Sequence, residues 1–171
     1  MRDGLALAMI GLLIWIPFAG FANGRPAGEL KREDFSVFDP ASGERIASLG
    51  QSIHDVVEAY GEPDRIEDIE THPQYMRYHY QGFTLLVTRS DREVALIWAT
   101  GATMKTARGV SVGDPRTEVE EKYPIGFYRW DDSMQGGYAL PENPFGTALF
   151  LSFRFSGEER VEDIRLGFAT Q

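Results

Sequence analysis

The sequence contains no cysteine among its 171 residues. Disulfide bonds, thiol catalysis, cysteine-ligated zinc and attachment of a lipid to an N-terminal cysteine are therefore excluded. A secreted domain of about 150 residues does not need disulfides, because its hydrophobic core can be large enough alone. The lack of cysteine is thus compatible with a location outside the cytoplasm.

Positive charge is also in short supply. Lys and Arg number 17 against 26 Asp and Glu, which gives a formal net charge of −9, and no stretch gathers Lys and Arg into a stripe. Such a surface repels the phosphates of nucleic acids and the headgroups of anionic lipids. We therefore expect no nucleic-acid partner, and no membrane contact except through the N-terminal segment.

The common catalytic signatures are missing as well. The sequence has no G-x-S-x-G, H-E-x-x-H or G-x-G-x-x-G motif and no P-loop, so it shows no activated serine, zinc or nucleotide site of these kinds. Two carboxylates that converge in space would still support glycoside chemistry, but nothing in the sequence singles out a pair. The sequence therefore predicts a protein that is not an enzyme, with no catalytic residues and no cofactor.

Metal ligands form no recognisable pattern. His54 and Glu58 stand four residues apart on a predicted helix, where a surface ion pair is expected because no third ligand is suggested. The acidic runs at 67–70 and 130–133 lack the alternating oxygen ligands and the turn glycine of a calcium loop. No metal site is expected at these residues, nor at the other two histidines, His72 and His79.

An uncharged apolar run, LALAMIGLLIWIPFAGFA, occupies residues 5–22 and is followed by a polar stretch. Its position after Arg2, and the small residues Gly20 and Ala22 at its end, favour a cleaved signal peptide over residues 1–22. An uncleaved anchor is the alternative, since the run reaches the lower length limit of a membrane-spanning helix. A buried core helix fits less well, because the run has no polar face. A signal peptide or an anchor predicts export, to the periplasm or the extracellular space.

Two similar segments, SLGQSIHDVVEAYG at 48–61 and SVGDPRTEVEEKYP at 111–124, each predict the start and end of a short helix. Ser52 or Gln51 is expected to cap the first helix, and Asp114 the second. The segments align without a gap, and Ser, Gly, Val, Glu and Tyr recur at equivalent positions. This match suggests an internal duplication.

The regions that follow the two helix segments share a pattern of strands. Both contain β-branched and aromatic runs, an acidic turn with arginine, and then a Val-x-x-Ile strand, which favours antiparallel hairpins. The pattern predicts an α+β fold of two tandem units, each a short helix or helix pair followed by a three-stranded antiparallel sheet. The units are expected over 46–105 and 106–171, after a polar linker at 23–45 with one short strand at 35–38.

The run SLGQSIHDVVEAYGEPDRI, with YMRYHYQGFTLLV after it, resembles the SmpA/OmlA (BamE-like) domain of outer-membrane assembly lipoproteins. That domain has a φ-G-x-[ST]-x-x-x-V-x-x-x-φ-G-x-P-D run before a three-stranded sheet rich in Tyr and Trp. The second copy, in TARGVSVGDPRTEVEEKYP, makes the whole resemble the β-lactamase-inhibitor-protein-like fold over 46–168. The resemblance implies a non-enzymatic protein that binds other proteins. The missing cysteine departs from the assembly lipoproteins, which carry a lipid anchor there.

Strand alternation predicts a face that carries aromatic and arginine side chains, because successive residues of a strand point to opposite sides. In 147–155 the odd positions are apolar and suit the core, so the even positions, Phe150 and Arg154 among them, are expected to face outward. The same argument turns the odd positions of 75–80 outward, and Trp98 is expected to join them. This composition is typical of protein–protein hot spots. The competing interpretation is that the rings cover the sheet or pack the two units together.

A second candidate patch lies in the expanded loop at 126–146, since loops often carry specificity. The full set of candidate protein-binding residues is Tyr75, Arg77, His79, Trp98, Tyr128, Trp130, Tyr138, Phe150 and Arg154.

The sequence thus predicts an exported, non-catalytic bacterial cell-envelope protein that binds another envelope or secreted protein, in an assembly or maintenance role. Two other functions stay open. One is an inhibitor of a secreted hydrolase that acts through the 126–146 loop, and the other is an envelope protein that binds a small ligand in a deep pocket.

Overall fold

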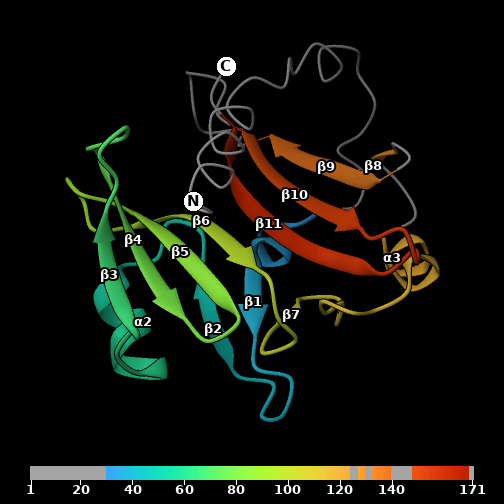
Figure 1. Ribbon diagram of the computed structural model, residues 1–171, viewed down its shortest axis with the longest axis horizontal. Helices are drawn as coiled ribbons and strands as arrows, with labels where there is room; N and C mark the ends of the chain where they lie inside the picture. Colours follow the sequence, from blue (N-terminus) through green and yellow to red (C-terminus); the bar gives the residue numbers. More distant parts are fainter. Residues whose placement is uncertain (1–29, 124–126, 130–131, 140–147, 170–171) are drawn as a thin grey trace, which may run out of the picture.

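The computed structural model describes residues 30–123, 127–129, 132–139 and 148–169. These residues form eleven strands, two α-helices and one short 3-10 helix (Figure 1). The predicted signal peptide or anchor at 1–22 lies outside the described residues. Within them, no helix has the length and apolar character needed to cross a membrane.

The largest element is an antiparallel sheet of eight strands. Its strands are rich in β-branched and aromatic residues, which suit the pleated surface of a sheet. Their order across the sheet is β3 (Arg65–Asp68), β4 (Tyr75–Tyr80), β5 (Phe83–Thr88), β6 (Val94–Ala99), β11 (Val161–Ala169), β10 (Ala148–Phe155), β9 (Ser133–Ala139) and β8 (Phe127–Arg129).

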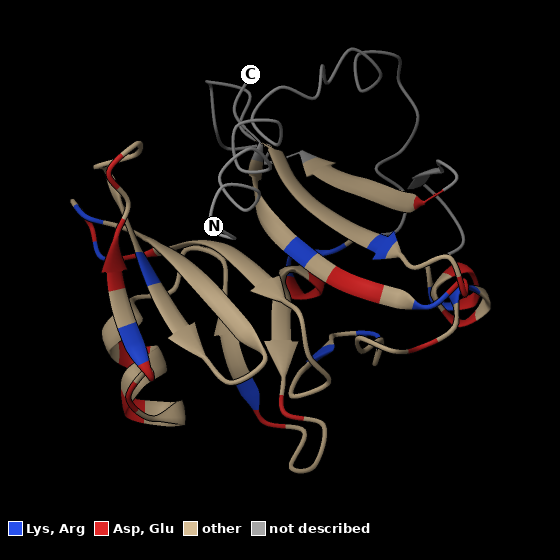
Figure 2. Cartoon of the chain, in the orientation of Figure 1, with Lys and Arg blue, Asp and Glu red and all other residues tan. Residues whose placement is uncertain are grey.

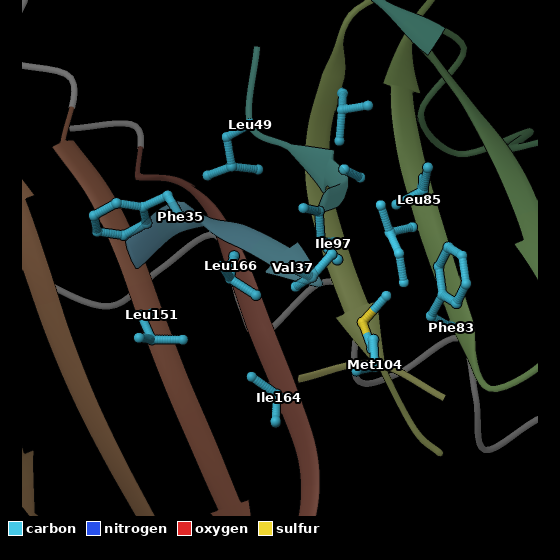
Figure 3. Packing of buried hydrophobic residues seen from close by; sticks show 14 of the residues in the cluster. Phe35, Val37, Leu49, Phe83, Leu85, Ile97, Met104, Leu151, Ile164 and Leu166 are labelled. Carbon is cyan, nitrogen blue, oxygen red and sulfur yellow. The ribbon is translucent and has the colours of Figure 1, made fainter. Parts of the chain in front are cut away.

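A second, three-stranded sheet packs against the large one. It follows the 3-10 helix η1 (Arg32–Phe35) and has the order β2 (Arg45–Ser48), β1 (Ser36–Phe38) and β7 (Lys105–Thr106). The strand expected at 35–38 is present as β1. Phe35 and Val37 are buried, and Figure 3 shows them between the β5–β6 and β10–β11 parts of the large sheet. Part of the predicted linker is therefore core.

The two helices lie on the same face of the large sheet as the small sheet. In α2 (Ile53–Tyr60) the ring of Tyr60 lies 5.5 Å from that of Phe83 on β5. At the end of α3 (Arg116–Lys122) the ring of Tyr123 lies 5.2 Å from that of Phe153 on β10. Since Phe83 and Phe153 both point into the core, we call this side of the large sheet its core face.

A buried ion pair joins the small sheet's entry to the end of α3. Arg108 Nε and Nη2 each lie 2.9 Å from a carboxylate oxygen of Asp34, in bidentate geometry. The same guanidinium donates to the backbone oxygen of Lys122 at 3.0 Å and lies over the ring of Tyr123, 4.7 Å from its centre. Burial raises the pKa of Tyr123 to about 12, so this residue stays neutral in the core.

The prediction of two tandem units, each with its own three-stranded sheet, is wrong. Strand β6 pairs directly with β11, so the strands of both halves form one continuous sheet. The pairs Ile97 with Leu166 and Ala99 with Ile164 bury the seam between them. The short strands β3 and β8 extend the two edges, and of the small sheet only the strand β1 was expected. In the part of the chain that the structure describes, one large sheet dominates and two short helices pack on it, which is not a tandem repeat.

The outer face of the sheet as candidate functional site

The side of the large sheet opposite the core face is here called the outer face. The small sheet, α2 and α3 all pack on the core face, so no described helix or strand covers the outer one. Residues of successive strands stand directly opposite one another on it and form a row from β3 to β9. This cross-strand row runs Arg65, His79, Thr84, Trp98, Arg165, Ser152 and Gln135.

A mainly apolar set of residues lies next to the cross-strand row. Leu86 and Leu96 are paired on β5 and β6, and Leu96 stands opposite Gly167 on β11. Gly167 in turn stands opposite Phe150, whose ring fills the space where a side chain at 167 would lie: an added Cβ would be 2.6 Å from ring carbon Cε1. Phe150 is only 8% exposed as a result of this and other packing.

The first charged group of the outer face centres on Glu67 of β3. Its Oε2 lies 2.9 Å from His79 Nε2, 3.2 Å from Arg65 Nη2 and 3.4 Å from Arg77 Nη1. The hydrogen bond to His79, followed by the charges of Arg77 and Arg65, lowers the pKa of Glu67 below its usual value. One carboxylate thus serves two arginines and a histidine. We call these four residues the Glu67 group.

The second charged group centres on Asp163 of β11, which is only 2% exposed. Arg154 Nε donates to its Oδ2 at 2.6 Å, and Arg165 Nη2 donates to the same oxygen at 3.2 Å. Arg165 Nε lies 2.9 Å from Oδ1 as an ion pair without hydrogen-bond alignment. Exposed Glu162 also contacts Arg154, at 3.3 Å. We call Asp163, Arg154 and Arg165 the Asp163 group.

The two charged groups are separated by two uncharged strands (Figure 2). In this band the guanidinium of Arg165 lies over the ring of Trp98, 5.2 Å from its centre, which is within range of a cation–π interaction. Trp98 Nε1 and Arg77 Nε are both buried and have no hydrogen-bond partner within the described part of the chain. An unsatisfied buried donor costs about 1–3 kcal/mol, and neither of these two atoms is accessible at the surface of the described structure.

The structure brings six of the nine predicted residues onto the outer face. Tyr75, Arg77 and His79 are on one side of β4, and Trp98, Phe150 and Arg154 are on the same side of β6 and β10. Tyr138 is not among them: it stands opposite Leu149 on the core face, and its ring lies 6.1 Å from that of Phe35. For Tyr128 only the strand pairing of β8 is described, and Trp130 lies outside the described residues.

Sequence reasoning missed Arg65, Glu67, Asp163 and Arg165. The signal for the last two was visible: in the strand VEDIRLGF, Asp163 and Arg165 stand at alternate positions, on the side opposite the apolar Ile164 and Leu166. Part of the predicted loop at 126–146 is not a loop, because residues 127–129 and 133–139 are strands β8 and β9.

Two other places were considered for chemistry. A shallow groove beside the start of α3 is lined by Glu120, Glu158 and Glu159, but Arg116 sits among them and pairs with two of the three, at 3.3 and 3.1 Å. No group of three His, Asp or Glu side chains able to hold a metal ion occurs in the described part of the chain. The outer face is therefore the best-developed surface for a functional role.

Comparison with known proteins gives little sequence similarity. No family model matches the chain. No curated protein matches it either. Among solved structures, it is similar to an extracellular protein containing an SCP domain from Bacillus anthracis, with 15% identity and a TM-score of 0.48 over 70% of this chain and 43% of that one. It is also similar to a cysteine-rich secretory protein from Staphylococcus aureus, with 16% identity and a TM-score of 0.46 over 72% and 44%.

These results overturn the family resemblance drawn from the sequence. The match to the SmpA/OmlA domain and to the tandem β-lactamase-inhibitor-protein-like fold is wrong: no family model matches, and the strands form one continuous eight-stranded sheet rather than two units. The quoted motif consists of helix-cap, helix-end and core residues, which many unrelated α+β chains need. The chain spans less than half the length of either solved structure, so their titles describe those proteins alone.

Proposed function

We propose that this is an exported, non-catalytic protein that binds another protein through the outer face of its large sheet. Export rests on the apolar run at 5–22, which has the position and ending of a signal peptide. The observation that carries the binding role is the outer face itself: a sheet surface without a covering layer in the described structure, with Tyr, Trp, Phe and Arg side chains on it. These residue types dominate the energetic centres of protein interfaces.

The burial of these side chains supports binding over simple solvent exposure. The Arg77 side chain is 17% exposed, and Trp98 is half-buried, so both are already held in place before a partner arrives. Pre-ordered side chains lose less conformational entropy on binding than flexible ones. A partner whose acceptor displaces the side chains that cover Trp98 Nε1 and Arg77 Nε would satisfy these two buried donors.

The test is site-specific photo-crosslinking in envelope extract of the source organism. Benzoylphenylalanine replaces Thr84, which lies between His79 and Trp98 on the outer face, and in a matched variant replaces His54, which is exposed on α2. We expect a protein adduct from position 84 but not from position 54, and its loss when Trp98→Ala is added. Equal adducts from both positions, or none from position 84, would refute the proposal.

A further inference from the structure

We propose that the outer face recognises an extended acidic segment of its partner, which lies across strands β4, β5, β6 and β11 with a carboxylate at either end. This inference rests on the proposed binding function and adds the chemistry of the partner. It is drawn from the surplus of donors on the face, from the spacing of the two charged groups and from the uncharged band between them.

Donors outnumber acceptors on the outer face. The Glu67 and Asp163 groups contain four arginines and a histidine, against the carboxylates of Glu67 and Asp163, with Glu162 at the margin. Each guanidinium has five N–H donors and no acceptor, so three carboxylates cannot satisfy four of them. Among the buried atoms of these residues that have no hydrogen-bond partner in the described part of the chain, three are donors (Trp98 Nε1, Arg77 Nε and Arg165 Nε) and one is an acceptor (Asp163 Oδ1). A partner that supplies carboxylate and carbonyl oxygens would accept hydrogen bonds from these surplus donors.

The spacing of the two groups suits an extended chain. His79 on β4 and Arg165 on β11 stand in the same cross-strand row, three strand steps apart, which is about 14 Å at the usual strand separation. An extended segment advances about 3.3 Å per residue, so two residues four apart are separated by about 13 Å. They also point the same way, since side chains alternate. The residue midway between them would face the Trp98 band.

The overall charge of the chain does not prevent this contact. The net charge of −9 repels an acidic partner at long range, but at about 0.1 M salt charges more than about 10 Å apart are largely screened. The acidic side chains of α2 and α3 lie on the core side of the sheet, whereas the partner contacts the arginines directly. Short-range pairing with the more accessible arginines of the two groups, Arg65, Arg77 and Arg154, therefore acts against the repulsion.

The test uses a blocked peptide with the core sequence glutamate-serine-leucine-serine-glutamate, titrated at about 0.1 M salt into the full chain labelled with ¹⁵N. The readout is the indole N–H resonance of Trp98, assigned by its loss in Trp98→Phe. The matched control peptide carries glutamine in place of both glutamates. We expect the Trp98 resonance to shift with the acidic peptide, at least tenfold weaker binding of the glutamine peptide, and loss of binding in Arg77→Ala.

Two outcomes would overturn the inference, and they separate it from the proposed function. If both peptides shift the Trp98 resonance equally, the face binds chains without reading their charge, so the inference fails while the binding role stands. If neither peptide shifts the resonance but position 84 still crosslinks to a protein, the partner is recognised by other chemistry. Failure of the crosslink as well removes the proposed function itself.

Discussion

The two charged groups of the outer face have similar composition, but the central carboxylate of one is exposed to solvent and that of the other is buried. Each places one main carboxylate between two arginines, yet Glu67 lies at the edge of the sheet with 39% of its side chain exposed, whereas Asp163 lies inside it with 2% exposed. The Asp163 group is held by the neighbouring strands β10 and β11, and the Glu67 group by the edge strand β3.

The contrast separates a structural role from a surface role. A buried charge without its partner is costly, so the Asp163 group must stay intact for the sheet to fold. An exposed ion pair contributes little to stability because water and salt compete with it. The Glu67 group is therefore free to exchange partners, and the predictions below separate the two groups by the size of their effects on folding.

Replacement of Asp163 has the largest expected effect. Asp163→Ala leaves Arg165, only 9% exposed, as an uncompensated buried charge, and should lower the free energy of unfolding by about 3–5 kcal/mol. The neighbouring Glu162→Ala removes an exposed partner of Arg154 and should cost less than about 1 kcal/mol. Urea denaturation measures both. Equal losses in the two variants would show that burial does not distinguish these carboxylates.

The packing of Phe150 on Gly167 should give the next largest effect. In Gly167→Ala the new Cβ would lie 2.6 Å from the Phe150 ring, so the ring must move, at a cost of about 1–3 kcal/mol. The double variant Phe150→Ala with Gly167→Ala removes this clash, and its loss of stability should be smaller than the sum of the two single losses. Strict additivity in this double-mutant cycle would show that the ring does not rest on Gly167.

Trp98→Phe should have little effect on stability but should weaken partner binding. The substitution keeps an aromatic ring beneath Arg165. Removal of the unpartnered Nε1 donor is favourable and loss of part of the half-buried indole is unfavourable, so the net change in the free energy of unfolding should be less than about 1 kcal/mol. The crosslink from position 84 should nevertheless become weaker, because the indole N–H is lost. A large drop in stability with unchanged crosslinking would make Trp98 a structural residue.

Glu67→Gln should have the smallest effect, and one that depends on pH. The pKa of Glu67 is lower in the folded chain than its usual value of 4.5, so its contribution to stability is present above pH 4.5 and is lost as the pH falls through the folded value. Wild type should therefore be slightly more stable than Glu67→Gln at about pH 7 and not at about pH 2. A difference that persists at acid pH would contradict the ion-pair assignment.

Local features of the fold were predictable from the sequence, whereas strand pairing over long distances was not. Ser52 caps α2 as one of the two expected residues, since its Oγ accepts from the backbone N–H of His54 at 3.2 Å. Asp114 was expected to cap α3, but its carboxylate accepts from Ser111 N instead and Pro115 precedes the helix. The pairing of β6 with β11 joins strands far apart in the chain, and periodicity carries no information about such pairs.

The candidate site was likewise predictable only where it depends on the pattern within a single strand. Alternation identified which side of β4 and β10 is polar, because each strand alone shows it. It did not show that Trp98 lies opposite Arg165, since that contact requires the β6–β11 register. Tyr138 was expected in an expanded surface loop because the second helix-and-strand segment is about four residues longer than the first, yet it belongs to β9 and faces the core.

The most direct test of the outer face as a binding surface compares two arginines. Arg77 lies on the outer face, and Arg45 is exposed on β2 of the small sheet. The measurement is the yield of the position-84 crosslink in Arg77→Ala and in Arg45→Ala, with thermal unfolding of both as the stability control. Loss of the crosslink in Arg77→Ala alone, at nearly equal melting temperature, is the predicted result. Equal yields from the two variants would contradict the assignment of binding to the outer face.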